Sequence, residues 1–437
     1  MSILSLNNIH AGYVADVAVF PSLSMTFSAS KLHGISGPSG GGKSTLFHVL
    51  TGAMPEYFGY VKEGELRVLG QELMGLPMKD RAKMLSAVLQ SPNAQIIFEK
   101  VQDELAFVLE NRGLEEKEIY EKIHDYAQRM KLSLEAKTET LSGGEKQKLV
   151  IASALLMGHT LLLLDEPLAH LDEESAHEIM TLLRRITEEE GVTVLMIEHR
   201  IDFLKAYAHE LYWVDHGTIQ KGPWGNGDQL AIPERQKEQD GELLISLTGI
   251  TKTFGKRVLY NNLDFHLRKG DHVVITGRNG TGKTTLLKIL LGLEKITSGT
   301  IYRAYKKKVL LQKVGFVMQN PSYQLCMPTV QEELALGMKD LDTFHSVVKT
   351  FRLETLLGQH PQSLSEGQKR RVGVAAVLVR KPEILLLDEP SVGMDQKSLE
   401  AMMEAIFSLY EDTPLTMVTI THDQRLKGTF GRVFNLG

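Results

Sequence analysis

The sequence predicts an α/β protein of two tandem, related domains, each built on a mostly parallel β-sheet. Three observations lead to this prediction. The chain has 437 residues, which is enough for more than one hydrophobic core. Two glycine-rich loops, at 37–45 and 277–285, each stand between an apolar strand-like run and a helix-like run. The motifs that follow the first loop return in the same order after the second.

Composition narrows the class of protein further. Hydrophobic residues make up 43% and charged residues 24% of the chain, which is typical of globular proteins and excludes disordered and fibrous classes. The single cysteine, Cys326, excludes an internal disulfide, a multi-cysteine zinc site and an iron–sulfur cluster, and we assign it no role. The net charge of −5 weakens a nucleic-acid function.

No segment of the sequence is expected to cross a membrane or to direct secretion. The most apolar stretch, 149–164, is interrupted by a glycine, a histidine and a threonine and stops at Asp165. The N-terminal residues have no cationic region and no long apolar core. We therefore expect any membrane association to be peripheral, at the cytoplasmic face, and made through a partner.

The repeat sets the domain boundaries. The lysines of the two glycine-rich loops, Lys43 and Lys283, lie 240 residues apart. Three later motif pairs are each 223 residues apart, namely Ser142 and Ser365, Glu166 and Glu389, and His199 and His422. Turn-forming and polar residues between 222 and 241 indicate a short connection. We predict domains at 1–225 and 243–437, joined by a linker at 226–242.

Both glycine-rich loops have the spacing Gly-x4-Gly-Lys-Ser/Thr of a phosphate-binding loop. Glycines let backbone N–H groups face the phosphates, and the following helix N-terminus adds partial positive charge. The two lysines are predicted to reach the β- and γ-phosphates, and Ser44 and Thr284 to offer a hydroxyl to Mg²⁺. The predicted loop residues are Gly37, Pro38, Ser39, Gly40, Gly41, Gly42, Lys43, Ser44 and Thr45, and Gly277, Arg278, Asn279, Gly280, Thr281, Gly282, Lys283, Thr284 and Thr285.

A carboxylate pair follows a run of four apolar residues in each half, at Asp165-Glu166 and Asp388-Glu389. Such a run is typical of a central parallel strand, and ligands bind at the carboxyl ends of these strands. Each aspartate is predicted to hold Mg²⁺, and each glutamate to polarise the attacking water as a catalytic base.

In this order, the phosphate loop, Leu-Ser-Gly-Gly-Glu at 141–145, the apolar strand ending in Asp-Glu-Pro and the late histidine resemble the ATP-binding cassette (ABC) ATPases. The resemblance covers nearly the whole chain, twice. It implies ATP as the nucleotide, and two P-loop ATPase cassettes that each add an antiparallel β subdomain and a helical subdomain to the parallel core. It also implies that the cassettes pair head to tail within one chain, so that each phosphate loop faces the other cassette's signature residues, Ser142, Gly143 and Gly144 or Ser365, Glu366 and Gly367.

The resemblance assigns four more residue pairs to the nucleotide sites and their interface. They are the adenine-stacking aromatics Tyr13 and Phe254, the γ-phosphate-sensing and metal-binding glutamines Gln90 and Gln319, the catalytic switch histidines His199 and His422, and the interface-loop aspartates Asp172 and Asp395. One departure matters, because Glu366 replaces the first glycine of the second signature. A carboxylate that faces the triphosphate would weaken its binding, whereas one that faces solvent would leave the binding unchanged. We predict two active sites, with the site that contains Lys43 and Glu366 the slower.

The segments after the two glutamines resemble one branch of these ATPases more closely. Gln90-Ser-Pro-Asn-Ala-Gln95 and Gln319-Asn-Pro-Ser-Tyr-Gln324, each followed by an acidic helix start, are similar to the ATPases of energy-coupling factor (ECF) importers. These bring vitamins, vitamin precursors and transition-metal ions into prokaryotic cells. The resemblance implies two partners, a transmembrane coupling protein and a membrane substrate-binding subunit, with no substrate contact and no nucleic-acid contact by this chain.

Three alternatives remain beside the ECF interpretation. A ribosome-associated ABC ATPase usually has a long, charged linker, whereas here the segment from Glu234 to Glu242 is short and net acidic. The fused ATPase of monosaccharide importers typically has degenerate motifs in its second cassette, whereas Lys283 and Glu389 are present here. The ATPase of another ABC importer or exporter is the third. The sequence does not choose the transported substrate.

Overall fold

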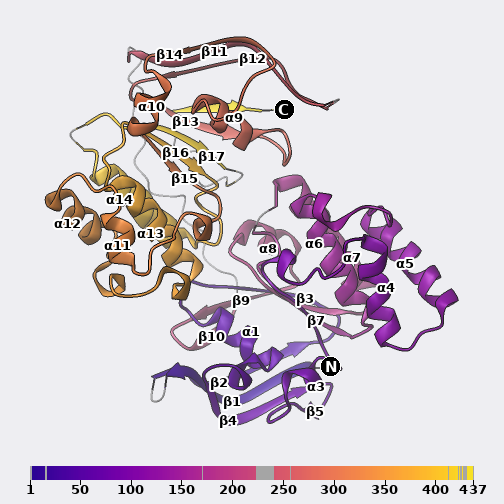
Figure 1. The fold of residues 1–437 in the computed structure, drawn as a ribbon. Helices are drawn as coiled ribbons and strands as arrows, with labels where there is room; N and C mark the ends of the chain where they lie inside the picture. Colours follow the sequence, from indigo (N-terminus) through magenta and orange to yellow (C-terminus); the bar gives the residue numbers. More distant parts are fainter. Residues whose placement is uncertain are drawn as a thin grey trace. The chain divides into compact units, whose positions relative to one another are not determined.

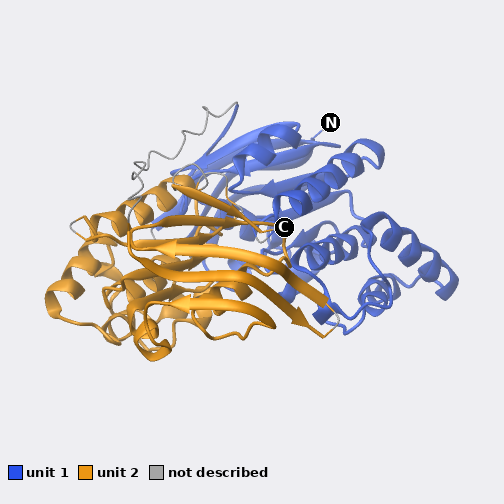
Figure 2. Cartoon of the chain, turned by 90° about the horizontal axis from the view of Figure 1, so that it is seen from above, with its two compact units in different colours: residues 1–227 blue, residues 228–437 orange. Residues whose placement is uncertain are grey.

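The computed structural model describes residues 2–14, 17–169, 171–222, 241–255, 257–411, 413–421, 423, 426 and 431–436. The chain divides into two compact units, unit 1 (residues 1–227) and unit 2 (residues 228–437), which have different colours in Figure 2. Each unit is described by itself. The predicted linker at 226–242 falls largely outside the described residues.

Unit 1 contains two sheets among its described residues. An antiparallel sheet has the strand order β2-β1-β4-β5, and a second sheet has the order β10-β9-β3-β8-β7-β6. In the second sheet every neighbouring pair is parallel except β9 with β10. The strands are β1 (Ser2–Val14), β2 (Val17–Ser28), β3 (Leu32–Ser36), β4 (Tyr60–Val68), β5 (Gln71–Glu72), β6 (Ser86–Val88), β7 (Leu161–Asp165), β8 (Thr193–Ile197), β9 (Glu210–Asp215) and β10 (Thr218–Lys221).

The helices of unit 1 lie on both sides of its parallel sheet (Figure 1). Helix α1 lies between the two sheets, whereas α4 to α7 lie on the far side of β3 and β7 from the antiparallel sheet (Figure 1). The helices are α1 (Lys43–Thr51), α2 (Ala53–Glu56), α3 (Met78–Arg81), α4 (Val101–Asn111), α5 (Glu116–Met130), α6 (Gly143–Leu156), α7 (Glu173–Glu189) and α8 (Ile201–Tyr207), with short 3₁₀ turns η1 (Pro92–Ala94) and η2 (Thr138–Thr140).

Unit 2 repeats this plan. An antiparallel sheet of order β12-β11-β14 accompanies a parallel sheet of order β15-β16-β17-β13-β18. The strands are β11 (Leu243–Phe254), β12 (Arg257–Arg268), β13 (His272–Thr276), β14 (Ser298–Arg303), β15 (Val314–Val317), β16 (Ile384–Asp388), β17 (Thr416–Ile420) and β18 (Arg432–Asn435). The helices are α9 (Lys283–Leu290), α10 (Lys307–Lys313), α11 (Val330–Ala335), α12 (Leu341–Thr350), α13 (Glu366–Leu378) and α14 (Gln396–Ser408), with 3₁₀ turns η3 (Pro321–Tyr323), η4 (Glu354–Leu356) and η5 (Pro361–Ser363).

These layers confirm the predicted fold class. The strands that precede the phosphate loops, β3 and β13, are central and almost fully buried, as their apolar sequences require. In unit 1 one hydrophobic cluster joins the antiparallel sheet, α1 and one face of the parallel sheet, and another joins the opposite face to the helices. Unit 2 has the same two clusters. The parallel sheet therefore presents the carboxyl ends of its strands from a packed core.

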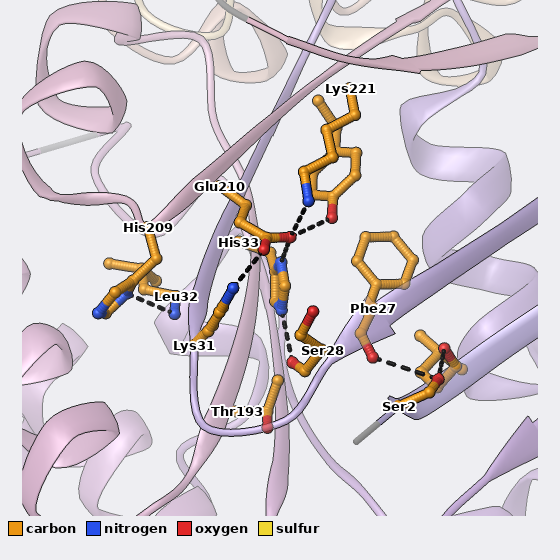
Figure 3. A network of polar contacts seen from close by, with 12 residues as sticks. Ser2, Phe27, Ser28, Lys31, Leu32, His33, Thr193, His209, Glu210 and Lys221 are labelled. Atoms are coloured by element: carbon orange, nitrogen blue, oxygen red, sulfur yellow. Dashed lines mark hydrogen bonds and ion pairs between the residues drawn. The ribbon is translucent and has the colours of Figure 1, made fainter.

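A buried glutamate, Glu210, links the start of β9 to the residue that precedes β3 in unit 1 (Figure 3). The carboxylate of Glu210 accepts hydrogen bonds from Lys31 at 2.5 Å, Tyr212 at 2.6 Å and Lys221 at 2.9 Å. His33 Nδ1 lies 3.5 Å from the same carboxylate. Burial alone raises the pKa of Glu210, but the three hydrogen bonds outweigh it and lower the pKa from 4.5 to about 2.

This network predicts acid sensitivity of unit 1. Because the folded pKa of Glu210 lies below the unfolded value of 4.5, its contribution is complete above pH 4.5 and is lost as the pH falls towards 2. A shift of this size corresponds to about 3 kcal/mol. In urea titrations, Glu210→Gln is therefore expected to cost most near pH 7, and the difference from wild type is expected to shrink between pH 5 and pH 3. A pH-independent difference contradicts the ion-pair explanation.

Candidate functional site

The two phosphate loops fold where the sequence places them, and glycine is required at their first position. In unit 1 a Cβ on Gly37, which has a φ of 156°, would lie 2.0 Å from the carbonyl oxygen of Val214. In unit 2 a Cβ on Gly277 would lie 2.2 Å from that of Leu436. Each loop ends at a left-handed glycine that precedes α1 or α9, Gly42 or Gly282. The loop backbone therefore passes against the neighbouring strand and delivers the lysine to the helix start.

Both loop lysines are buried and bend back over their own loops. Lys43 Nζ donates to the carbonyl oxygens of Gly37 at 2.8 Å and Pro38 at 2.9 Å. Lys283 Nζ donates to those of Gly277 at 2.7 Å and Arg278 at 3.0 Å. The remaining loop members lie on the same two segments. Ser39, Gly40 and Gly41 precede α1, and Ser44 and Thr45 lie in its first turn. Likewise Asn279, Gly280 and Thr281 precede α9, and Thr284 and Thr285 lie in its first turn. Each ammonium thus lies at its glycine-rich loop, where the lysine and the loop N–H groups would bind phosphate oxygens.

The residues at the strand ends fit a magnesium ion held with ATP phosphates. In unit 2 the hydroxyl of Thr284 donates to Asp388 at 3.0 Å, so a hydroxyl and a carboxylate oxygen already face one another. Hard oxygen donors of this kind suit Mg²⁺, which neutralises phosphate charge when bound. Burial raises the pKa of Asp388. In unit 1, burial and then the nearby Glu166 and Glu198 raise the pKa of Asp165 to about 7.

The predicted base of unit 1 is held between the predicted sensor and switch residues. Glu166 Oε2 accepts a hydrogen bond from Gln90 Nε2 at 2.9 Å, and Glu166 Oε1 lies 2.9 Å from His199 Nε2. The structure therefore brings together three residues that lie 76 and 33 positions apart in the sequence. One carboxylate thus contacts the predicted sensor and the predicted switch residue through its two oxygens.

Both predicted bases have an unusual backbone conformation. Glu166 has a φ of 46° and Glu389 a φ of 49°, in the left-handed region that side chains other than glycine rarely adopt. In each case the amide donates to the carbonyl of the next strand, Ile197 or Ile420, at 2.9 Å. Strain of this kind gathers at functional sites because the surrounding structure must hold it.

In unit 2 many of the predicted residues line one cleft of about 440 Å³. Its walls include the loop lysine Lys283, the carboxylates Asp388 and Glu389, and the sensor Gln319. Phe254, the predicted adenine-stacking residue, is 49% exposed at the cleft edge, and the Lys252 ammonium lies 4.3 Å from its ring centre. The predicted switch His422 lies outside the described residues.

The other predicted residues occupy defined places. Tyr13 of unit 1 is 45% exposed, its ring stacks on Phe58 at 6.0 Å, and its hydroxyl accepts from Thr45 at 3.4 Å. The interface-loop aspartates Asp172 and Asp395 cap the N-termini of α7 and α14. Their role between cassettes stays a prediction.

Each signature begins a helix through a capping box. The hydroxyl of Ser142 accepts from the amide of Glu145, and that of Ser365 from the amide of Gln368. Gly143 and Gly144 open α6, and Gly367 lies in the first turn of α13. The side chain of Glu366 lies outside the described residues. Pairing of each signature with the opposite phosphate loop stays a prediction.

The sequence assigns no role to two residues beside the sites, although Glu198 belongs to a segment, Ile197-Glu-His-Arg200, that resembles ECF ATPases. Glu198 precedes His199 and is 2% exposed. The sequence feature that could have indicated a role is its position, as an acidic residue directly after an apolar strand. Arg257 lines the cleft of unit 2 and donates to the carbonyl of Gly280 at 2.8 Å. No sequence pattern indicated that Arg257 lies beside the site, because its contact depends on the pairing of β11 with β12.

Comparison with known proteins identifies the family. The family model for ABC transporters matches residues 20–169 and 260–392. A protein of Treponema denticola named as an ABC transporter ATP-binding protein is 31% identical, over 96% of this chain and 92% of its own length. YkoD of Bacillus subtilis, named as an HMP/thiamine import ATP-binding protein, is 30% identical over 94% of this chain and 85% of its own length.

Solved structures agree on the fold. The model of ribosome-bound archaeal Pelota and ABCE1 has a chain with a TM-score of 0.70 and 24% identity, covering 95% of this chain and 74% of that one. Over the described ranges, no helix of this chain is both long and apolar enough to pass through a bilayer. Matched by the family model along both of its halves, the chain belongs to the ATP-binding proteins of the ABC transporter family, which bind and hydrolyse ATP.

Proposed function

We propose that this chain is the ATP-hydrolysing, energy-coupling subunit of a membrane importer of the ECF type, for a vitamin, a vitamin precursor or a transition-metal ion. ATP and Mg²⁺ draw the two cassettes together, and hydrolysis assisted by Glu166 and Glu389 lets them part. Partner proteins in the cytoplasmic face of the membrane turn this movement into transport. The chain itself contacts neither the substrate nor nucleic acid.

The observation that carries this proposal is a braced loop after each sensor glutamine. In unit 1 the side chain of Gln95 accepts from Leu89 N at 2.7 Å and donates to Ala87 O at 3.2 Å. The buried carboxylate of Glu104 accepts from Ile97 N and Phe98 N, both at 2.8 Å. Both residues belong to the segments that resemble ECF ATPases, so the resemblance rests on residues that build this loop.

Unit 2 builds the same loop from the equivalent residues. Gln324 accepts from Met318 N at 3.2 Å, and Glu333 accepts from Cys326 N at 2.8 Å and Met327 N at 2.9 Å. The braced loops hold large apolar side chains in solvent, with Ile97 72% and Tyr323 79% exposed. Exposed apolar side chains on rigid loops are suited to a protein partner. We propose that cytoplasmic helices of the coupling protein dock there.

The relatives support import without choosing the cargo. The name of YkoD includes HMP and thiamine import. The likeness to ABCE1 supports the fold alone, so the ribosome remains an outcome of the test.

Co-purification tests the proposal. The tagged chain, expressed in its own host and extracted in mild detergent, is expected to bring down a polytopic membrane protein and a small membrane protein whose ligand names the cargo. Ile97→Asp with Tyr323→Asp is expected to abolish this capture. Tyr302→Asp, on the 51% exposed Tyr302 of β14, is the control and is expected to retain it. Ribosomal proteins with no membrane partner would overturn the proposal.

A further inference from the structure

A buried carboxylate joins two loops of the proposed nucleotide site in unit 1. Glu198 follows strand β8 and is 2% exposed. Its Oε1 accepts from the amides of His199 at 2.8 Å and Arg200 at 3.0 Å. Its Oε2 accepts from the amide of Leu168 at 3.1 Å, on the loop that follows β7. One side chain thus binds the backbone of both loops.

The hydrogen bonds require an acceptor on both oxygens of Glu198. Burial, and then the nearby Glu166, raises the pKa of this carboxyl, whereas the amide of Arg200 and the charges of His199 and Arg200 act in the opposite direction. All three bonded groups are N–H donors, so the ionised carboxylate matches them on both sides. A glutamine has one oxygen and one amino group, so it keeps one side of the bridge and turns a donor towards a donor on the other.

The bridged loops carry the two residues that face each other across the site. Leu168 is two residues beyond Glu166, and His199 is adjacent to Glu198. The carboxylate of Glu166 lies 2.9 Å from His199 Nε2. A second hydrogen bond joins the same two loops, because Arg200 donates to the carbonyl of Leu171 at 3.1 Å. The loops that carry Glu166 and His199 are therefore joined through the Glu198 carboxylate, in addition to the bond from the Glu166 amide to Ile197 O.

Unit 2 has a different residue at the same place. Thr421 follows β17 as Glu198 follows β8. The amide of Thr421 donates to Ile275 O at 3.2 Å, just as the amide of Glu198 donates to Ile35 O at 3.0 Å. The hydroxyl of Thr421 accepts from the amide of Asp423 at 3.0 Å, within its own loop. A threonine offers a single oxygen close to the backbone, so it cannot hold two loops with two oxygens.

We infer that Glu198 is a positioning residue for ATP hydrolysis in unit 1, and that the two nucleotide sites depend on different supports. Glu198 keeps Glu166 and His199 at hydrogen-bonding distance through the backbone of both loops. In the part of unit 2 that the structure describes, Thr421 stands in its place and bonds within its own loop. This inference rests on the proposed roles of Glu166 and His199.

The test is a double-mutant cycle on the full chain, measured by steady-state ATPase. In a Glu389→Gln background, which leaves the predicted base of unit 1, Glu198→Gln is expected to lower kcat about 10-fold with little change in KM, because misplacing a base costs rate more than binding. In a Glu166→Gln background the same change is expected to alter kcat less than about twofold. Where turnover of the sites is coupled, single-turnover cleavage of one ATP per chain replaces kcat.

Two controls separate positioning from stability. Glu198→Thr copies the unit 2 residue and is expected to give the same background-dependent loss. Glu210→Gln removes another buried glutamate of unit 1 and is expected to lower the melting temperature without a loss confined to one background. An equal loss from Glu198→Gln in both backgrounds, or none with the unit 1 base intact, overturns the inference. If Glu166→Gln itself leaves hydrolysis unchanged, the assignment of the base has failed instead.

Discussion

Glu166→Gln and Glu389→Gln, made singly, are expected to lower ATP hydrolysis unequally, and together to lower it roughly 10²- to 10⁴-fold, the usual contribution of a positioned base. Each variant removes the carboxylate that would polarise the attacking water, while leaving the loop lysine in place. We expect Glu389→Gln to remove the larger share, because the unit 1 phosphate loop is predicted to face the signature that contains Glu366.

The backbone conformation and contacts of these two glutamates support their predicted role as bases. Each glutamate follows the last residue of a central parallel strand in a left-handed conformation, and each amide is fixed to the neighbouring strand. Glu166 also contacts Gln90 and His199, so its carboxylate lies where phosphate, water and sensor residues would meet. Glutamine has the same shape and cannot accept the proton of the attacking water.

The measurement is phosphate release from the purified chain, with ATP binding followed separately by fluorescence of a nucleotide analogue. Binding is expected to survive in both variants, since Lys43 and Lys283 are untouched. Equal loss of hydrolysis in the two single variants argues against unequal sites. Retention of more than about a tenth of the rate in the double variant argues that another group acts as the base.

The local parts of the sites could be predicted because each depends on a short segment. Glycine spacing determines the phosphate loops, and Gly37 and Gly277 have no room for a side chain. A serine followed three residues later by Glu145 or Gln368 determines the capping boxes. The buried runs before Asp165 and Asp388 could only become central strands.

The supports of these parts could not be predicted because they join segments that are distant in sequence. Glu198 contacts an amide 30 residues away, and Arg81 contacts a carbonyl 32 residues away. The two units also use residues from different elements to bond the last carbonyl groups of the helix that follows the phosphate loop. Arg81 on α3 bonds the last carbonyls of α1, whereas Arg303 on β14 bonds those of α9. Such a contact depends on the tertiary fold rather than on a motif, so no spacing of residues in the sequence predicts it.

Arg81→Met is expected to destabilise unit 1 by about 2–4 kcal/mol, because buried carbonyl groups that lose their donor cost about 1–3 kcal/mol each. The Arg81 side chain is 2% exposed. Its guanidinium donates to Leu76 O at 3.0 Å and to Val49 O at 2.5 Å, at the end of the helix that begins with Lys43. Methionine keeps the stem but leaves these carbonyl groups buried without donors. Burial lowers the pKa of Arg81, with Glu56 and Glu72 opposing it, so the folded site bears a cost for holding the charge.

Differential scanning calorimetry measures the net effect of losing the hydrogen bonds of Arg81 and of no longer burying its charge. A loss of this size corresponds to a fall in melting temperature of roughly 10 °C for a unit of this length. The matched variant Arg303→Met is expected to shift the unit 2 transition by less, because Arg303 is only partly buried at the end of α9. A shift below about 2 °C for Arg81→Met would mean that the cost of burying the guanidinium nearly cancels its hydrogen bonds. The arginine would then fix the position of α1, and with it Lys43, without adding net stability.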